Sequence, residues 1–556
     1  MTWDEAVAAV TGPGGPFELV EAEVGGERLR VFKNTPPSLR ALFGAARARG
    51  DATFLVFEDE RWSFADVMAK ADALGAALAG RYGIRPGDRV AIAMRNYPEW
   101  VVAFAAITGV GAISVSLNAW WTTDELDYAL SDSGSRVVIA DGERLARLAP
   151  LLGKDGLRAI AVRSEGALPA GADAWREVVV DGAPLPDVDV RPDMDATILY
   201  TSGTTGHPKG AVSTHRAVLS ALLSFACRAA INSAMGVGPK RAQPWPTSFI
   251  LVVPLFHVTG CVPVMLSCFA AGDKLVMMYK WDAARALELI ERERVTQFVG
   301  VPTQSWDLLE CPDFARRDTS SLVSVGGGGA PAPPELVRRV DRSFAAARPG
   351  IGYGMTETNA YGPGNAGDDY LGKPTSCGRV VPAVEMRVTD PEGRTLGPNE
   401  VGELWFRGAN LIRGYWNKPD ATAETIVGGW LRSGDIGRID EEGFVYVQDR
   451  AKDMVLRAGE NVYCAEVEAA VYEHPDVYEA AVFGVPHERL GEEVAVALVP
   501  KPGRTLDSDA LRRFLAERLA PFKIPTRLAI HADPLPRNPA GKILKRTLRD
   551  ALVAGG

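Results

Sequence analysis

The chain alternates short apolar runs with longer stretches of helical periodicity. Short runs rich in Val, Ile and Leu indicate buried strands, and the stretches between them indicate helices that cover a mostly parallel sheet. The strand-like runs are 90–94, 137–140, 196–200, 295–301 and 322–325, and the helical stretches are 39–49, 65–82, 211–228 and one that starts at 333–335. This order predicts a doubly wound α/β fold.

Four segments depart from this alternation. Residues 54–58 and 61–64 are two β-rich runs around a short polar turn and predict a hairpin. Residues 151–195 are rich in Gly, Ala and Pro and predict a surface excursion, whereas 227–248 mix small residues with glycines and prolines and predict a long loop. Since long irregular loops are often functional, we expect this loop to lead into a binding pocket.

Composition and charge narrow the classes of function. The 556 residues exceed one ordinary core and allow roughly three or four units. With 61 Lys and Arg against 70 Asp and Glu, the net charge of −9 disfavours nucleic acid as a partner. The six cysteines form no C-x-x-C pair, which favours neither a structural zinc nor a disulfide framework and indicates a reducing, cytoplasmic compartment.

Membrane insertion is not predicted. The acidic N-terminus lacks the charged and apolar regions of a signal peptide. Two uncharged runs, 100–121 and 249–272, exceed the roughly 18 residues of a candidate membrane span. Both contain small or helix-breaking residues and neither has strongly basic flanks, so buried strand–turn–helix segments explain them better and we expect no transmembrane segment.

The most informative segment is 200–210, with the sequence YTSGTTGHPKG, which follows an apolar strand-like run. Its glycines allow close backbone approach, its hydroxyls can donate to phosphate oxygens, and Lys209 adds a cation. A Walker A loop has Ser or Thr after its lysine, but Gly210 follows Lys209 here, which disfavours a P-loop NTPase. The segment therefore indicates a different kind of polyphosphate loop.

Three further motifs follow in the chain. In GYGMTE, residues 352–357, a hydroxyl and a carboxylate could serve a phosphate and a magnesium ion. The Asp of SGD, residues 433–435, is by itself typical of a turn. Lys542 closes the sequence PRNPAGK; without context, a lysine near a C-terminus is commonly a solvated surface residue.

Taken together, and in this order, these motifs closely resemble those of the adenylate-forming superfamily, which contains acyl- and aryl-CoA synthetases, nonribosomal peptide adenylation domains and firefly luciferase. The resemblance spans almost the whole chain and is nearest to medium- and long-chain acyl-CoA synthetases of fatty-acid metabolism. It implies a large multi-layer N-terminal domain with doubly wound sheets over 1–449, a hinge at 450–453 and a small mobile α+β C-terminal domain over 454–556.

The resemblance also implies roles in nucleotide binding. Tyr353 would stack on adenine, Asp435 would accept the ribose hydroxyls, and Thr356 would contact the α-phosphate. Glu357 and Thr201 would hold Mg²⁺, and the catalytic residues would be Lys542, Thr356, Glu357 and Lys209. The full set expected around ATP and AMP is Thr201, Ser202, Gly203, Thr204, Thr205, Gly206, Gly328, Gly329, Ala330, Pro331, Gly352, Tyr353, Gly354, Met355, Thr356, Asp435, Arg450 and Lys542.

The sequence PLFHVTG at 254–260 resembles the family segment that lines the acyl pocket. The expected walls are Phe256, His257, Val258, Gly260, Val301, Pro302 and Gly352. A lone histidine is commonly a satisfied core residue, but here we expect His257 beside the carboxylate or at the gate of the pocket. Because 249–272 lacks a charged partner for an ammonium group, we expect a fatty, branched, aryl or polycyclic acid rather than an amino acid.

For the second half of the reaction, the resemblance places Gly459, Glu460 and Asn461 in the CoA tunnel and makes Lys452 the hinge residue. It thus predicts an ATP- and Mg²⁺-dependent acyl-CoA ligase. Two alternatives stay open: an enzyme that stops at acyl-AMP or passes it to a carrier protein, and a non-catalytic nucleotide-binding module. The presence of Lys542, Glu357 and Asp435 argues against the second. The oligomeric state stays open, a homodimer being one option.

Overall fold

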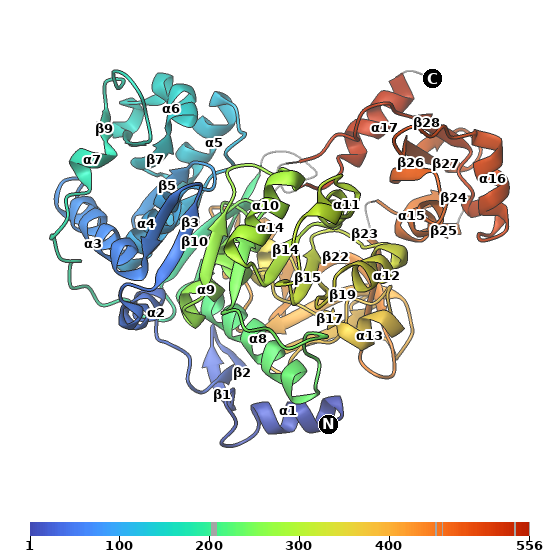
Figure 1. Ribbon diagram of the computed structural model, residues 1–556, viewed down its shortest axis with the longest axis horizontal. Coiled ribbons are helices and arrows are strands. Elements are labelled where there is room, and N and C mark those ends of the chain that lie inside the picture. Colours follow the sequence, from blue (N-terminus) through green and yellow to red (C-terminus); the bar gives the residue numbers. More distant parts are fainter. Residues whose placement is uncertain (202–207, 451–452, 459, 539–540, 555–556) are drawn as a thin grey trace.

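The protein was analysed as a computed structural model of residues 1–556. The structure describes residues 1–201, 208–450, 453–458, 460–538 and 541–554. Figure 1 shows a large body that carries the N-terminus and a smaller unit, formed by the last hundred or so residues, that carries the C-terminus.

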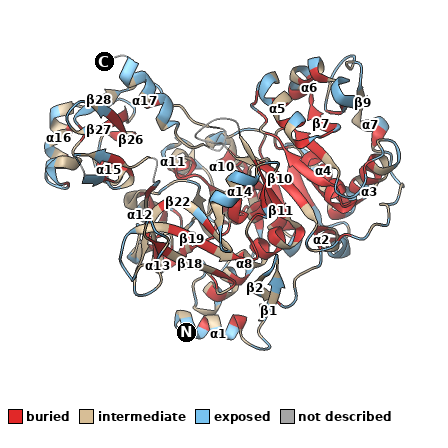
Figure 2. Cartoon of the chain, turned by 180° about the vertical axis from the view of Figure 1, so that it is seen from behind, coloured by how far each residue is buried: buried red, intermediate tan, exposed pale blue. Residues whose placement is uncertain are grey.

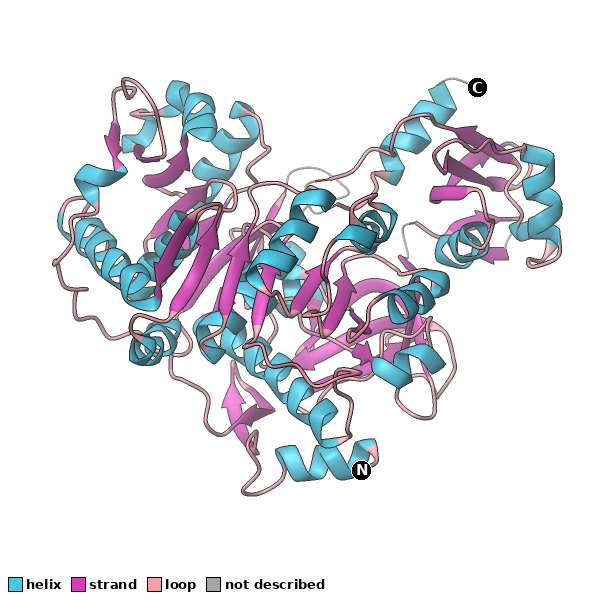
Figure 3. Ribbon diagram, viewed as in Figure 1, coloured by secondary structure: helices cyan, strands magenta, loops and turns pink. Residues whose placement is uncertain are grey.

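Two eight-stranded sheets build the large body (Figure 3). The first has the order β20 (Gly414–Tyr415), β11 (Lys209–Thr214), β10 (Asp195–Thr201), β6 (Ile113–Ser116), β5 (Arg89–Ala93), β7 (Val137–Asp141), β8 (Arg158–Val162) and β9 (Ala172–Ala174). The second has the order β17 (Gly364–Ala366), β16 (Arg348–Gly352), β15 (Ser324–Gly328), β14 (Gln297–Gly300), β12 (Ser248–Leu251), β13 (Lys274–Met277), β3 (Thr53–Phe57) and β4 (Glu60–Ser63). Both are parallel except where an edge strand or hairpin joins them, as at β10–β11 and β3–β4.

Helices cover both faces of these sheets. They are α1 (Trp3–Thr11), α2 (Leu39–Ala46), α3 (Phe64–Gly80), α4 (Pro98–Gly109), α5 (Thr123–Ser133), α6 (Gly142–Leu148), α7 (Trp175–Val178), α8 (His215–Ala234), α9 (Ser267–Ala271), α10 (Ala283–Glu293), α11 (Pro302–Glu310), α12 (Pro334–Ser343), α13 (Gly367–Gly372) and α14 (Pro419–Thr425). Every residue of α4 is buried, which explains the uncharged run that begins at Trp100. Figure 2 shows buried residues concentrated in the strands of the large body and in helices that pack against them, such as α4.

Strand β5 shows how the sequence pattern builds the layers. Its residues alternate between faces, as the pleat of a strand requires. Val90 and Ile92 join the core that both large sheets share, whereas Ala91 and Ala93 join a second core on the other face, beneath α5 and α6. A strand that is apolar on both faces is therefore explained by burial on both faces.

A third, five-stranded sheet completes the large body. It consists of β18 (Val384–Thr389), β19 (Gly402–Gly408), β22 (Trp430–Ile439), β21 (Ile426–Val427) and β23 (Val445–Arg450). The N-terminal hairpin of β1 (Leu19–Val24) and β2 (Glu27–Phe32) forms a separate two-stranded sheet.

The C-terminal unit has its own sheet and its own core. The sheet contains β25 (Glu460–Val462), β24 (Val455–Arg457), β27 (Gly491–Pro500), β26 (Val477–His487) and β28 (Arg527–Ile530), with helices α15 (Cys464–Tyr472), α16 (Ser508–Ala516) and α17 (Lys545–Ala554). Its two apolar clusters contain only residues from Val455 onward. An α/β body with a small α+β unit therefore confirms the predicted fold class.

Several local predictions are confirmed and others are wrong. The hairpin is β3–β4, and the helix that starts with proline is α12. The predicted helix over 211–228 begins only at His215, because the preceding residues pair with β10 and β20 as β11. It continues to Ala234, about two turns into the predicted loop over 227–248. The predicted excursion over 151–195 also contains a buried strand, β8, of the first sheet.

Helix α8 is the one helix among the described residues with the length and hydropathy of a membrane span. Half of its apolar window is buried, and it packs against α1, β11 and the turn before α9. We interpret it as a core helix. The two runs that the sequence singled out, 100–121 and 249–272, instead form buried helices and strands.

Candidate active site

One large cavity brings most of the predicted site residues together. Its volume is about 2110 Å³. That exceeds the roughly 300–1,000 Å³ of a pocket for a single drug-sized ligand, so it has room for a nucleotide and an acid together. Its walls come from the carboxyl ends of strands in both large sheets, from the third sheet and from the C-terminal unit, a position typical of ligand sites in open α/β sheets.

The predicted residues that line it are Thr201, Lys209, Phe256, His257, Val258, Val301, Gly328, Gly329, Gly352, Tyr353, Gly354, Met355, Thr356, Glu357, Arg450, Asn461 and Lys542. Asp435 lies buried just behind the wall formed by Gly434 and Ile436. The remaining phosphate-loop residues, Ser202, Gly203, Thr204, Thr205 and Gly206, lie outside the described part of the chain, as do Lys452 and Gly459.

Besides Asp435, five predicted residues among those described do not line the cavity. Gly260 is instead a packing residue, because a Cβ there would collide with the carbonyl oxygen of Pro254. Pro302 begins α11 and is buried in its first turn. Ala330 and Pro331 lie beyond the end of β15, Glu460 is an exposed residue of the edge strand β25, and none of the three lines the cavity.

The polar end of the cavity is built around a short turn at Thr356–Thr358. Glu357 is buried, and its Oε1 accepts a hydrogen bond of 2.6 Å from the hydroxyl of Tyr415. The turn ends at Asn359, whose φ of 52° is left-handed. Asn359 Nδ2 donates to the carbonyl of Asn410 at 2.9 Å, and Asn410 Nδ2 donates to the carbonyl of Thr358 at 3.0 Å, which fixes the turn.

Asp435 is held on both oxygens. Its register partner across β22 and β23 is Arg450, whose Nε lies 3.3 Å from Oδ1, and the Tyr353 hydroxyl donates to Oδ2. Burial raises the pKa of Asp435, while Arg450 and the hydrogen bond from Tyr353 act in the opposite direction. The predicted ribose acceptor thus lies within a strand, with both oxygens already oriented.

Lys542 reaches the cavity from the C-terminal unit. Its backbone N–H donates to Asn538 Oδ1 at 2.9 Å, and Arg537 anchors the loop through an ion pair of 2.8 Å with Glu479 of β26. Burial lowers the pKa of Lys542, and the nearby cation of Arg450 lowers it further. A lysine in this setting is a candidate for work on anionic substrate oxygens rather than a solvated surface residue.

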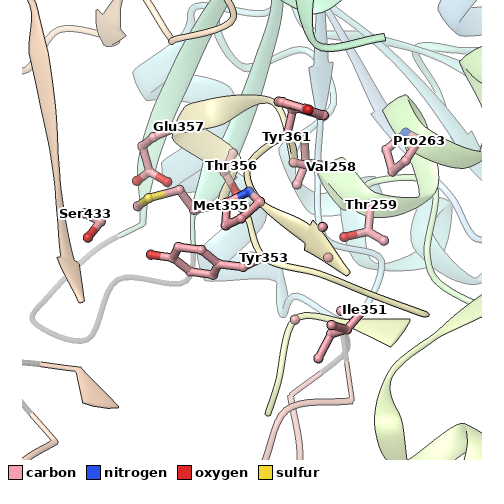
Figure 4. A pocket seen from close by; sticks show the side chains of 18 of the residues that line it. Val258, Thr259, Pro263, Ile351, Tyr353, Met355, Thr356, Glu357, Tyr361 and Ser433 are labelled. Carbon is pink, nitrogen blue, oxygen red and sulfur yellow. The ribbon is translucent and has the colours of Figure 1, made fainter. Parts of the chain in front are cut away.

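At the apolar end, Pro263 lines the cavity, and the sequence did not predict it. It lies inside a π-helical turn, Gly260–Leu266, an arrangement frequent at functional sites. In Figure 4, Pro263, Val258 and Thr259 lie away from Glu357 and Ser433, with Tyr353 between the two groups. The cavity therefore has a polar and an apolar end.

His257 lines the cavity as a neutral ring. Burial lowers its pKa to about 4. Its Nδ1 accepts a hydrogen bond of 3.3 Å from the N–H of Thr259, which leaves the ring proton on Nε2. His257 can therefore donate a hydrogen bond to a substrate, but it supplies no cation at neutral pH.

Charged residues also reach the far part of the cavity. Asp273, one residue beyond the uncharged segment, lines it, and burial raises the pKa of this carboxyl to about 6. Arg228 of α8 lines it as well, with its Nη1 donating to the carbonyl of Gly364 at 2.6 Å. The expectation of a charge-free pocket thus applies to 249–272 and not to the whole cavity.

The donor set suits a hard ion that takes most of its ligands from phosphates. Within the described residues, no cluster of three or more His, Cys, Asp or Glu side chains could hold a metal. Glu357 and the hydroxyl of Thr201 both line the cavity. Mg²⁺ is commonly bound through one or two carboxylates together with substrate phosphates and water, so these residues fit a nucleotide-bound Mg²⁺.

Comparison with known families agrees with this geometry. The family model of the AMP-binding enzyme matches residues 42–416, and that of the AMP-binding enzyme C-terminal domain matches residues 466–542. This chain belongs to the AMP-binding enzyme family. The resemblance to the adenylate-forming superfamily is thereby confirmed.

Relatives of this AMP-binding enzyme include acyl-CoA ligases. It is 35% identical to the feruloyl-CoA synthase of Amycolatopsis sp over 509 residues, 91% of this chain and 96% of the relative. It is also 35% identical to the long-chain-fatty-acid–CoA ligase FadD13 of Mycobacterium tuberculosis over 505 residues, 89% of this chain and 94% of the relative. The AMP-binding enzyme is thus an AMP-forming acid–thiol ligase.

Solved structures give the same picture. The ATP-bound MatB from Rhodopseudomonas palustris is 30% identical, with a TM-score of 0.80 over 92% of this chain and 99% of that chain. The anthranilate CoA ligase AuaEII in complex with anthranoyl-AMP is 25% identical, with a TM-score of 0.82 over 93% of this chain and 98% of that chain.

Sequence reasoning missed several lining residues of this AMP-binding enzyme. They include Tyr415, Pro263, Tyr463 and Asn538. Tyr415 lies in the sequence NLIRGYW, which carries no charged pair or glycine spacing that would indicate a phosphate site. The pairing of β20 with β11 brings its ring to Lys209.

Proposed function

We propose that the protein activates an apolar carboxylic acid with ATP as an acyl-adenylate and then transfers the acyl group to the thiol of CoA. The observation that carries this proposal is one continuous cavity whose polar end holds Thr356, Glu357 and Lys542 and whose apolar end holds Val258 and Pro263. The names of the two relatives, a feruloyl-CoA synthase and a long-chain-fatty-acid–CoA ligase, support an acid without a second charged group.

In the first step, a carboxylate oxygen of the acid attacks the α-phosphorus of ATP, and the bond from that phosphorus to the pyrophosphate oxygen breaks. The step gathers negative charge, so preorganised donors and cations contribute most to the rate. We assign Lys542 to the carboxylate and α-phosphate oxygens and Thr356 to the α-phosphate. Glu357 and Thr201 would hold Mg²⁺, which neutralises phosphate charge when bound.

In the second step, the CoA sulfur attacks the acyl carbon, and the bond from that carbon to the AMP oxygen breaks. Oxide is a poor leaving group and AMP a good one, which is why the acid is adenylated first. We propose that the unit after the hinge at 450–453 then rotates, which would withdraw Lys542 and admit the thiol. Asn461 already lines the cavity from the C-terminal side of that hinge.

The test is acid-dependent exchange of labelled pyrophosphate into ATP across a panel of fatty, aryl and polycyclic acids, followed by analysis of products with and without CoA. Exchange with an apolar acid, together with CoA-dependent AMP and thioester, is the expected result. Exchange without thioester would indicate that the acyl acceptor is not CoA but another molecule or a carrier protein. No exchange with any acid would indicate that the protein is a nucleotide-binding module without adenylation activity. ADP as the product, in place of AMP, would indicate an ATPase of another type.

A further inference from the structure

Tyr415 connects three parts of the polar end that are far apart in the sequence. Its hydroxyl donates to Glu357 Oε1 at 2.6 Å, and Lys209 Nζ lies 4.2 Å from the centre of its ring. Tyr415 is 8% exposed and Glu357 is 7% exposed, so the hydrogen bond is shielded from water. A short hydrogen bond to a carboxylate in such surroundings is among the stronger ones in proteins.

The backbone fixes the ring in this position. Tyr415 pairs with Ala211 in the register between β20 and β11, two residues after Lys209. Its own N–H donates to Thr422 Oγ1 at 2.9 Å, and that hydroxyl donates in turn to the carbonyl of Lys418 at 2.9 Å. The ring is therefore held by a strand on one side and by the start of α14 on the other.

The hydroxyl is the donor in this contact. An ionised carboxylate can only accept hydrogen bonds, so the phenol O–H of Tyr415 supplies the proton shared with Glu357 Oε1. Glu357 Oε2 has no hydrogen-bond partner among the described residues, and Glu357 lines the cavity in Figure 4. One carboxylate oxygen is thus occupied by the protein and the other is left for a ligand.

We propose that Tyr415 is a positioning residue for the metal–nucleotide site: its hydroxyl holds Glu357 in the orientation that binds a divalent cation on ATP, while its ring face holds the ammonium of Lys209 beside the phosphates. This inference rests on the proposed adenylation reaction. It concerns a residue that the sequence motifs did not include.

The variant that tests this is Tyr415→Phe, which keeps the ring and removes only the hydroxyl. Mn²⁺ binding is measured by electron paramagnetic resonance in the presence of α,β-methylene-ATP, which cannot be cleaved at the α-phosphorus. We expect the variant to bind Mn²⁺ at least about tenfold more weakly, as expected for loss of a hydrogen bond to a charged group. In pyrophosphate exchange, the Mg²⁺ concentration for half-maximal rate should rise by a similar factor, and saturating Mg²⁺ should restore much of the rate.

The matched control is Tyr446→Phe, which removes a tyrosine hydroxyl that donates to Asp440 Oδ2 at 3.1 Å, away from the cavity. It should leave Mn²⁺ affinity unchanged. Unchanged Mn²⁺ affinity in Tyr415→Phe would overturn the proposal, as would a loss of exchange that saturating Mg²⁺ does not restore in a variant with the parent melting temperature. If the parent protein itself catalyses no exchange, the proposed function fails, while the Mn²⁺ measurement still decides the role of Tyr415.

Discussion

The hydroxyl of Tyr353 donates a hydrogen bond to the carboxylate of Asp435, 82 residues further along the chain. The first residue lines the cavity and the second lies buried behind it, so the contact couples the expected adenine platform to the expected ribose acceptor. The ionised form of Asp435 depends on this donor and on Arg450, because burial opposes its charge.

This contact predicts a pH effect for Tyr353→Phe. Since the hydrogen bond lowers the pKa of Asp435, its removal should raise that pKa further. The carboxylate should then take up a proton at a higher pH, and ATP affinity should be lost at a higher pH on acidification. Titration of ATP binding against pH measures the shift. The same curve in variant and parent would contradict the coupling, and Tyr446→Phe serves as the distant control.

Lys542 predicts an alkaline limit for adenylation. Burial and the neighbouring Arg450 lower its pKa, so the ammonium loses its proton at a lower pH than an ordinary lysine with a pKa of 10.5. Pyrophosphate exchange should therefore decline on the alkaline side, while thioester formation from supplied acyl-AMP should not share that decline. In Lys542→Arg, any remaining exchange should keep its rate to higher pH, because a guanidinium stays protonated. A common limit for both half-reactions would refute the assignment.

A contact between the two units predicts a change in the balance of half-reactions. Tyr478 of β26 donates to Asp307 Oδ1 of α11 at 2.8 Å, and Trp281 donates to the other oxygen at 2.8 Å. The proposed rotation about the hinge must break the contact with Tyr478. A hydrogen bond to a charged group contributes about 1.5–3 kcal/mol, so Tyr478→Phe should lower the ratio of adenylation to thioester-forming rates about 12- to 160-fold.

The control for this variant lies within the C-terminal unit. Tyr472 donates to the carbonyl of Ala480 at 3.2 Å, and Tyr472→Phe removes a hydroxyl without touching the large body. Its two half-reaction rates should keep the parent ratio. An equal ratio in Tyr478→Phe and in the parent would show that the contact does not favour the position of the C-terminal unit before the proposed rotation over the position after it.

Gly352 predicts how the cavity selects acids. A Cβ at this position would meet no atom within 4 Å, so the side chain of Gly352→Val would extend into the cavity. Crowding of a well-fitted site costs about 1–3 kcal/mol. We expect kcat/KM for aryl and polycyclic acids to fall about 5- to 150-fold, with little loss for short-chain acids, in an assay across the acid panel. Equal loss for all acids would argue against a wall at this position.

Gly354 offers the contrasting substitution. A Cβ there would collide with the carbonyl oxygen of Ala360, so Gly354→Ala should lower the melting temperature rather than change acid preference. Gly238→Ala, where a Cβ would meet nothing within 4 Å and the residue lies outside the cavity lining, should change neither property.

Much of the fold and the site could be predicted because the relevant signals are local. Apolar strands such as β5 and β7 have a pattern that burial on both faces requires, and the GYGMTE turn needs Gly354 because its backbone passes close to the carbonyl of Ala360, six residues further on. The error at 211–214 concerned a boundary, where the apolar periodicity of the helix was extended too far toward the N-terminus. Val212 and Thr214 are β-branched and favour a strand, and these residues form β11 because β10 and β20 offer partners on both sides.

The sequence by itself determined the order of motifs, the fold class and the residues expected to carry the chemistry, because each of these depends on short stretches of backbone and side-chain chemistry. Only the tertiary structure decided which groups meet. Tyr415 and Glu357 are 58 residues apart, and Tyr478 and Asp307 are 171 apart. Their contacts depend on strand register and on the packing of the two units, and no local pattern encodes either.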